Sequence, residues 1–174
     1  MSESFWAAAS EEIVMDKMPL TALVFQSIPE SIILFALGLT LMGVPLRWKR
    51  IVPAALILSA TSYLVRSMPL PYGIHTIASL LALYLLFIIL FRTPILLSAI
   101  AALSSLIALL SLELLLWPFI FFVTNISIKD IWHQPILRIV IPLPELALLS
   151  IITWWCKKNK ITLSTFWPFH KKQK

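Results

Sequence analysis

The longest apolar stretch of the chain, residues 94–126, decides the fold: PILLSAIAALSSLIALLSLELLLWPFIFFVTNI. Glu113 is the only charged residue within it. A helix that crosses a bilayer needs about 20 apolar residues. The stretch is therefore too long for one untilted spanning helix and too short for two helices with a loop. We expect a spanning helix that breaks near Pro118, with the remainder at the membrane interface or re-entering the bilayer.

Further apolar segments lie on both sides of this stretch. The chain is 60% hydrophobic and 13% charged, whereas soluble domains are typically about 25% charged. This composition excludes a water-soluble globule, which would expose large apolar patches, and it excludes disorder. We predict an all-α, polytopic transmembrane helix bundle of about five spans, with a possible extra re-entrant or sixth segment. The other spans are expected at about residues 20–44, 51–65, 74–91 and 135–156.

The distribution of cations predicts the orientation. Lys and Arg accumulate on the cytoplasmic side of membrane proteins. With five spans, most of the 14 Lys and Arg residues fall on one side with no acid beside them, which predicts an outside N-terminus and a cytoplasmic C-terminus. Because these cations border apolar segments, we do not expect nucleic-acid binding despite the net charge of +6. They are Arg47, Lys49, Arg50, Arg92, Lys157, Lys158, Lys160, Lys171, Lys172 and Lys174.

The two ends of the chain are predicted to lie outside the bundle. Residues 1–18 carry Glu3, Glu11, Glu12 and Asp16, unlike the basic start of a secretory signal peptide. Their mixture of acids and apolar residues predicts an extracytoplasmic amphipathic segment. The transmembrane helical domain then covers residues 19–156, and residues 157–174 form a basic cytoplasmic tail.

Six ionisable residues within or beside the spans form the candidate site. An ionisable group inside a membrane costs a few kcal/mol unless it is paired or hydrated, so each is a default functional hypothesis. At about 1.5 Å per helical residue, all six fall in the outer half of the bilayer. Helices packed around one axis would bring them into one polar cluster. They are Glu30, Arg66, His75, Glu113, Arg138 and Glu145.

Two of these acids follow a proline, as Pro29-Glu30 and Pro144-Glu145. Proline suits the first turn of a helix, where its missing N–H is not needed. Glutamate in that turn interacts favourably with the positive end of the helix dipole. We therefore predict helix breaks at Pro29 and Pro144, each starting a half-helix at the floor of a polar cavity that opens outward.

Structural roles are the alternative interpretation of the same residues. Glu30–Arg66 or Glu145–Arg138 pairs could fix helix packing without binding a ligand. His75, in the first turn of the third span, could sense pH, donate to a ligand or bond at a helix interface. Small residues at helical spacing along the fourth span indicate a packing face, which could equally dock a partner. They are Ser98, Ala101, Ala102, Ser105 and Ala108.

The sequence favours binding over catalysis. The single cysteine, Cys156, is predicted on the side of the membrane opposite to His75 and His133, so it has no base to activate it. The histidines do not have metal-binding spacing. We therefore predict no enzyme activity, no metal and no cofactor.

Several short motifs occur together: RSMPLPYGIH at residues 66–75, SIPE at 27–30, Glu113, and PLPE at 142–145. In these motifs the chain resembles the N-terminal membrane-spanning module of GHKL-type sensor histidine kinases of Firmicute bacteria, and related short standalone membrane proteins. The similarity covers about residues 20–156. It implies a bacterial membrane protein that receives an extracytoplasmic cue. Because only 18 residues follow Cys156, we expect no kinase domain here and output through a partner protein.

These observations predict a multi-pass protein of the bacterial cytoplasmic membrane. We expect a sensor-like or accessory subunit with an outward-facing polar pocket for a small molecule or peptide. Its partners would be the lipid bilayer and a membrane protein or a second copy of the chain. Two alternatives stay open: a small carrier or substrate-binding subunit of a transporter, and a structural membrane scaffold.

Overall fold

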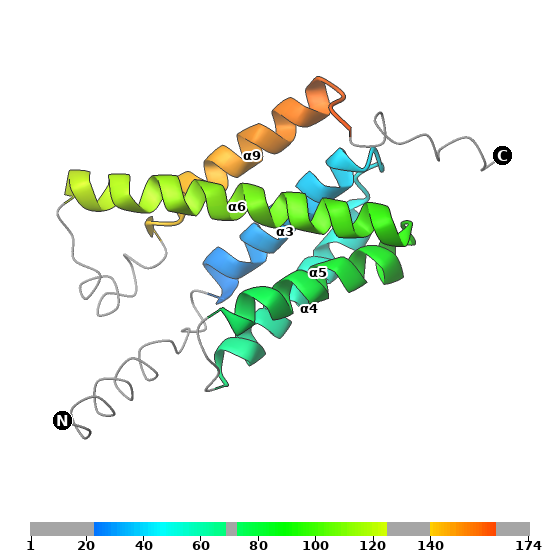
Figure 1. The fold of residues 1–174 in the computed structure, drawn as a ribbon, viewed down its shortest axis with the longest axis horizontal. Helices are drawn as coiled ribbons and strands as arrows, with labels where there is room; N and C mark the ends of the chain where they lie inside the picture. Colours follow the sequence, from blue (N-terminus) through cyan, green and yellow to red (C-terminus); the bar gives the residue numbers. More distant parts are fainter. Residues whose placement is uncertain (1–22, 69–72, 125–139, 163–174) are drawn as a thin grey trace.

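The structure, a computed structural model, describes residues 23–68, 73–124 and 140–162, and every regular element within these ranges is helical. This confirms the all-α prediction. Figure 1 shows α6 crossing in front of α3, with α9 on one side and α4 and α5 on the other. The elements in chain order are the π-helical turn η1 (Leu23–Ser27), α3 (Ile28–Leu41), α4 (Trp48–Arg66), α5 (Ile74–Phe91), α6 (Ile95–Thr124) and α9 (Leu143–Lys158).

Three of these helical segments are long and apolar enough to cross a bilayer: Leu23–Leu41, Ile74–Phe91 and Ile95–Ile120. The second of them has the bounds that the sequence predicts. Helix α4 is longer than its predicted 15-residue span, because the flanking residues Lys49, Arg50 and Arg66 continue the helix rather than ending it. Helix α9 has 16 residues, about 24 Å at 1.5 Å per residue.

The predicted break at Pro118 is wrong. Helix α6 continues through Pro118 to Thr124 over 30 residues, about 45 Å at 1.5 Å per residue. A proline removes one backbone hydrogen bond and can kink a helix, but the apolar residues on both sides keep the helical conformation here. The helix is longer than the hydrocarbon core of a bilayer, about 30 Å. Its C-terminal part consequently extends past the other helices (Figure 1).

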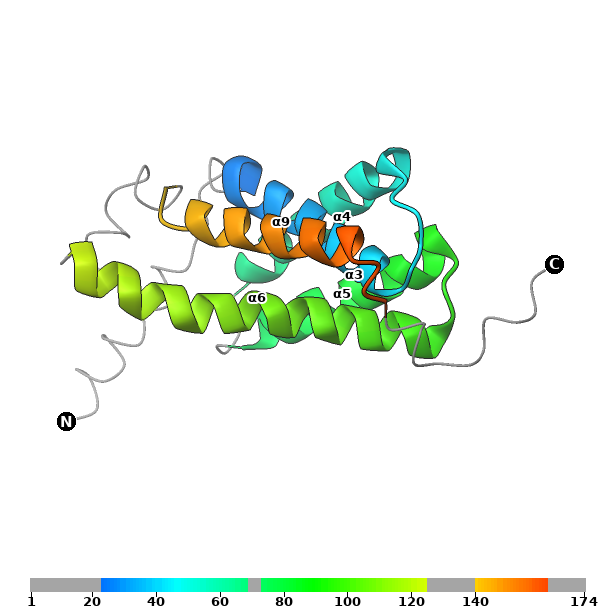
Figure 2. The ribbon, with the colours of Figure 1, turned by 90° about the horizontal axis from the view of Figure 1, so that it is seen from above.

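Helix α3 lies at the centre of the bundle and packs against α4, α6 and α9, as the perpendicular view in Figure 2 also shows. One apolar cluster joins α3, α4, α5 and α6 around Phe35 and Phe87, whose rings meet edge to face at 5.2 Å. A second joins α3, α6 and α9 around Leu37, Leu109 and Leu149. The small residues of α6 are part of this packing: Ser98, Ala101, Ala102 and Ser105 are fully buried and Ala108 is partly buried, which confirms the predicted packing face.

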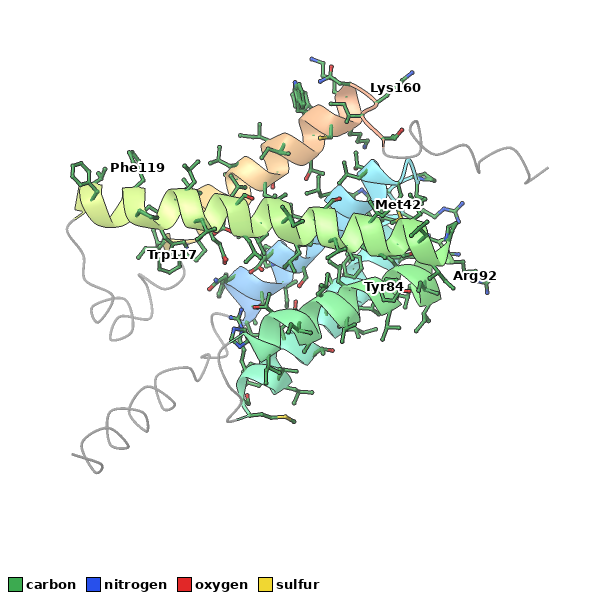
Figure 3. All side chains as sticks on the ribbon, viewed as in Figure 1. Met42, Tyr84, Arg92, Trp117, Phe119 and Lys160 are labelled. Atoms are coloured by element: carbon green, nitrogen blue, oxygen red, sulfur yellow. The ribbon has the colours of Figure 1, made fainter. Side chains whose placement is uncertain are left out.

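Charge divides the bundle along its length. Figure 3 shows Met42, Arg92 and Lys160 at one end and Trp117 and Phe119 at the other. The first end, which we call the basic end, holds the α3–α4 and α5–α6 connections and the C-terminus of α9. Among described residues, every Lys and Arg except Arg66 lies there, and all three acids lie in the opposite half. The cations of the basic end are Arg47, Lys49, Arg50, Arg92, Lys157, Lys158 and Lys160.

The outward-facing surfaces of the helices are apolar. On α5, one row of large side chains repeats every four residues and is exposed along the whole helix: Ile77, Leu81, Leu85 and Ile89. Similar exposed residues cover α6 and α9. Soluble proteins rarely expose apolar patches of this extent. The three long apolar helices together with these surfaces are compatible with a membrane protein.

Candidate functional site

A cavity of about 80 Å³ lies between α3, α4, α5 and α6, in the half of the bundle away from the basic end. It borders four of the six predicted site residues, one from each helix: Glu30, Arg66, His75 and Glu113. All four are partly buried. We call this cavity the polar pocket. Residues that are 83 positions apart in the sequence, Glu30 and Glu113, thus border one space.

The local sequence explains how each helix presents its polar residues. In α3, Pro29 and Glu30 occupy the first turn, the position that the Pro-Glu pattern favours. The helix is not interrupted at Pro29, however, because η1 precedes it directly and only the winding changes from π to α. Helix α5 begins after Gly73, whose φ of 95° is available to glycine without strain. This turn places His75 in the first turn of α5.

Glu145 and Arg138 differ from the other four predicted residues. Glu145 lies in the first turn of α9 with Pro144 beside it, is only 5% exposed, and is not among the residues that line the pocket. When ionised, its carboxylate is repelled by the carboxylates of Glu113 and Glu30. Its Oε1 atom accepts no hydrogen bond within the described structure. Arg138 lies outside the described residues.

Arg66 is the counter-ion of the pocket. Its guanidinium has favourable Coulombic interactions with both Glu30 and Glu113. It ends α4, and it is the only Lys or Arg in this half of the described chain. One guanidinium therefore interacts electrostatically with the carboxyl groups of two different helices.

Hydroxyl groups connect the same helices, and sequence reasoning missed them. Ser59 of α4 donates to the Ser27 carbonyl oxygen at 3.0 Å and hydrogen-bonds Ser31 at 3.0 Å. Ser62 and Ser79 join α4 to α5 at 3.0 Å. The signal was present as helical spacing, because each hydroxyl lies three or four residues from an ionisable group or from another hydroxyl. The hydroxyl residues that line the pocket are Ser27, Ser31, Ser62, Thr76 and Ser79.

Ser59→Ala is expected to destabilise the bundle by about 1 kcal/mol, because Ser59 is 1% exposed and both of its hydrogen bonds join neighbouring segments. The measurement is the free energy of unfolding in detergent micelles. Thr61→Ala is the matched control, because the Thr61 hydroxyl donates only within its own helix, to the Ile57 carbonyl oxygen. This substitution should lower the free energy of unfolding by less than half as much as Ser59→Ala does. Equal effects of the two substitutions would contradict an interhelical role for Ser59.

The inner wall of the pocket is apolar. Four buried leucines from the four helices lie one or two helical turns deeper than the ionisable groups: Leu34, Leu58, Leu83 and Leu109. Among the described residues, no three His, Cys, Asp or Glu side chains gather closely enough to hold a metal ion. Cys156 is buried near the basic end, whereas His75 borders the pocket. The arrangement can bind a solute through the charges and hydroxyls at one end of the pocket and through hydrocarbon contacts with the leucines at the other.

Comparison of the chain with protein-family models, with curated proteins and with solved structures finds no match.

Proposed function

We propose that the chain is a multi-pass protein of the bacterial cytoplasmic membrane that binds a small solute from the extracytoplasmic side and acts through a partner. The single observation that carries the proposal is the polar pocket. Four ionisable side chains from four helices border it, although each would be costly in lipid unless paired or hydrated. Their convergence around one cavity supports a binding site.

The asymmetry of charge supports the orientation. The basic end has seven cations and no acid among described residues, and cytoplasmic ends of membrane proteins are basic. The polar pocket lies in the opposite half, so it would open to the outside. In this proposal α4 and α9 complete five spans. The Lys and Arg side chains at both ends of α4, and Lys157 and Lys158 at the C-terminal end of α9, can reach the headgroup region.

The four helices that share the pocket, and their apolar outer faces, support action through a partner. Binding in a cavity that four helices share can change how those helices pack. Their outer faces are exposed and apolar, so a change in packing is accessible to another membrane helix. The resemblance to sensor-kinase membrane modules is in accord with this role and stays a prediction.

Orientation is tested by cysteine labelling in intact cells. The background is Cys156→Ala, which removes the single cysteine. Met68→Cys places a thiol at an exposed site beyond the end of α4, on the pocket side, and Lys160→Cys places one at the basic end. A membrane-impermeant thiol reagent should label the first variant in intact cells and the second only after permeabilisation. The reverse pattern would overturn the orientation.

The partner is tested by affinity purification from native membranes after crosslinking. We expect one membrane protein to co-purify with the wild-type chain, and its yield to change at least threefold with Glu30→Gln or Glu113→Gln. Arg92→Gln, at the basic end, is the control. A yield that neither pocket substitution changes would contradict signalling through the pocket and favour the structural scaffold. Solute uptake by vesicles that contain the chain would favour the carrier.

A further inference from the structure

The polar pocket is amphiphilic along its depth. Glu30, Arg66 and Glu113 line one end of it, and leucines line the other end, the floor, one or two helical turns further along the helices. The floor leucines are buried, between 1% and 6% exposed. An occupant that matches both regions carries its charge at one end and hydrocarbon at the other.

The charge of the surrounding half indicates the sign of that occupant. Among the described residues, the carboxyl groups of Glu30 and Glu113 line the pocket against the one guanidinium of Arg66. Glu145 is buried outside the pocket lining, and its Oε1 atom accepts no hydrogen bond within the described structure. A cation in the pocket offsets the excess of carboxyl groups, whereas an anion is repelled.

The volume of the pocket limits the size of the occupant. A cavity needs about 10–15 Å³ of this kind of volume for each water molecule. At the larger value, about 80 Å³ holds roughly five atoms of that size. One nitrogen and about four carbons fill it. Pockets that bind drug-sized ligands measure about 300–1,000 Å³, so this pocket is too small for a peptide.

We propose that the polar pocket binds a small primary alkylammonium ion with a chain of about four carbons. An ammonium group has three N–H donors. The carboxylates of Glu30 and Glu113 and the hydroxyl of Ser31 can accept them, while the alkyl chain contacts the leucine floor. This inference rests on the proposed binding role of the pocket and names its ligand class.

The test is isothermal titration of the full chain in lipid nanodiscs with n-butylammonium chloride, corrected for heat from empty nanodiscs. We expect saturable binding. The neutral analogue n-butanol, of the same length, should bind at least tenfold more weakly, and sodium butyrate should give no saturable heat. Glu30→Gln and Glu113→Gln should each weaken n-butylammonium binding at least tenfold. Ser111→Ala, an exposed residue on the same helix as Glu113, should leave binding unchanged.

Leu83→Ala supplies a second readout that does not depend on the acids. It deepens the floor, so the preference should shift from n-butylammonium toward n-hexylammonium by at least threefold. The inference is overturned by an absence of saturable binding, by equal affinity for n-butylammonium and n-butanol, or by full displacement of n-butylammonium by equimolar sodium or potassium ions. If the labelling of Met68→Cys still shows an outward pocket end in that case, only the ligand class fails and the proposed function stands.

Discussion

Gly38→Ala is expected to destabilise the protein by about 1–3 kcal/mol, opposite in sign to the usual effect of this substitution. Alanine in a helix interior is normally favoured over glycine by about 1 kcal/mol. Here a Cβ atom at position 38 would overlap the Phe87 ring and lie 3.1 Å from Ser105 Oγ. Phe87 is fully buried and held against Phe35, so it cannot move aside at low cost. The measurement is the free energy of unfolding in detergent micelles.

A matched control and a rescue make this prediction specific. Ala60→Val adds bulk to an exposed position on α4 and should change stability by less than about 0.5 kcal/mol. In a Phe87→Leu background the ring is absent, so Gly38→Ala should cost much less than in the wild type, which a double-mutant cycle detects. An increase in stability for Gly38→Ala alone would show that α3 does not approach α5 this closely.

Arg66→Met is expected to destabilise the bundle by about 3 kcal/mol. The substitution keeps most of the side-chain volume but removes the only described cation in the pocket half, leaving Glu30 and Glu113 without their guanidinium. Unfolding in detergent micelles and the yield of folded protein in membranes both measure the effect. Arg92→Met removes an exposed cation at the basic end and should change stability by less than about 0.5 kcal/mol.

A double variant distinguishes the effect of the lost charge from the effect of altered side-chain packing. Arg66→Met combined with Glu30→Gln restores the charge balance at the pocket, so it should recover at least half of the lost stability. Wild-type stability for Arg66→Met alone would contradict the role of Arg66 as counter-ion. If Arg66 and Glu30 are strongly coupled in stability but no pocket variant changes the association with the partner, the protein is a structural scaffold rather than a sensor.

The sequence predicted the features that depend on local chemistry. Helix α5 has its predicted bounds because an apolar run ends at Arg92 and begins after a glycine with positive φ. Pro29 and Pro144 stand in the first turns of α3 and α9, because proline has no N–H to lose there. Depth along each helix placed Glu30, Arg66, His75 and Glu113 at one level, and the structure brings them around one cavity.

Features that depend on packing between helices were not predictable from one chain. Nothing in the sequence near Pro118 shows that α6 continues past it. Whether a helix ends at a proline depends on whether the surrounding structure compensates for the one lost backbone hydrogen bond. The position of Glu145 outside the pocket lining depends on which side of α3 the helix α9 occupies. The hydrogen bond between Ser62 and Ser79 likewise depends on the rotation of two helices about their axes.

The most direct test of the central claim, that a water-filled pocket opens away from the basic end, is the reaction of one cysteine on each side of α5 with charged methanethiosulfonate reagents added to intact cells. In a Cys156→Ala background, Ser79→Cys lines the pocket, and Leu81→Cys lies on the outer face, where the leucine is 54% exposed. We expect Ser79→Cys to react from outside, faster with the cationic than with the anionic reagent, and Leu81→Cys to be shielded by lipid. Reaction of Leu81→Cys but not Ser79→Cys would contradict that claim.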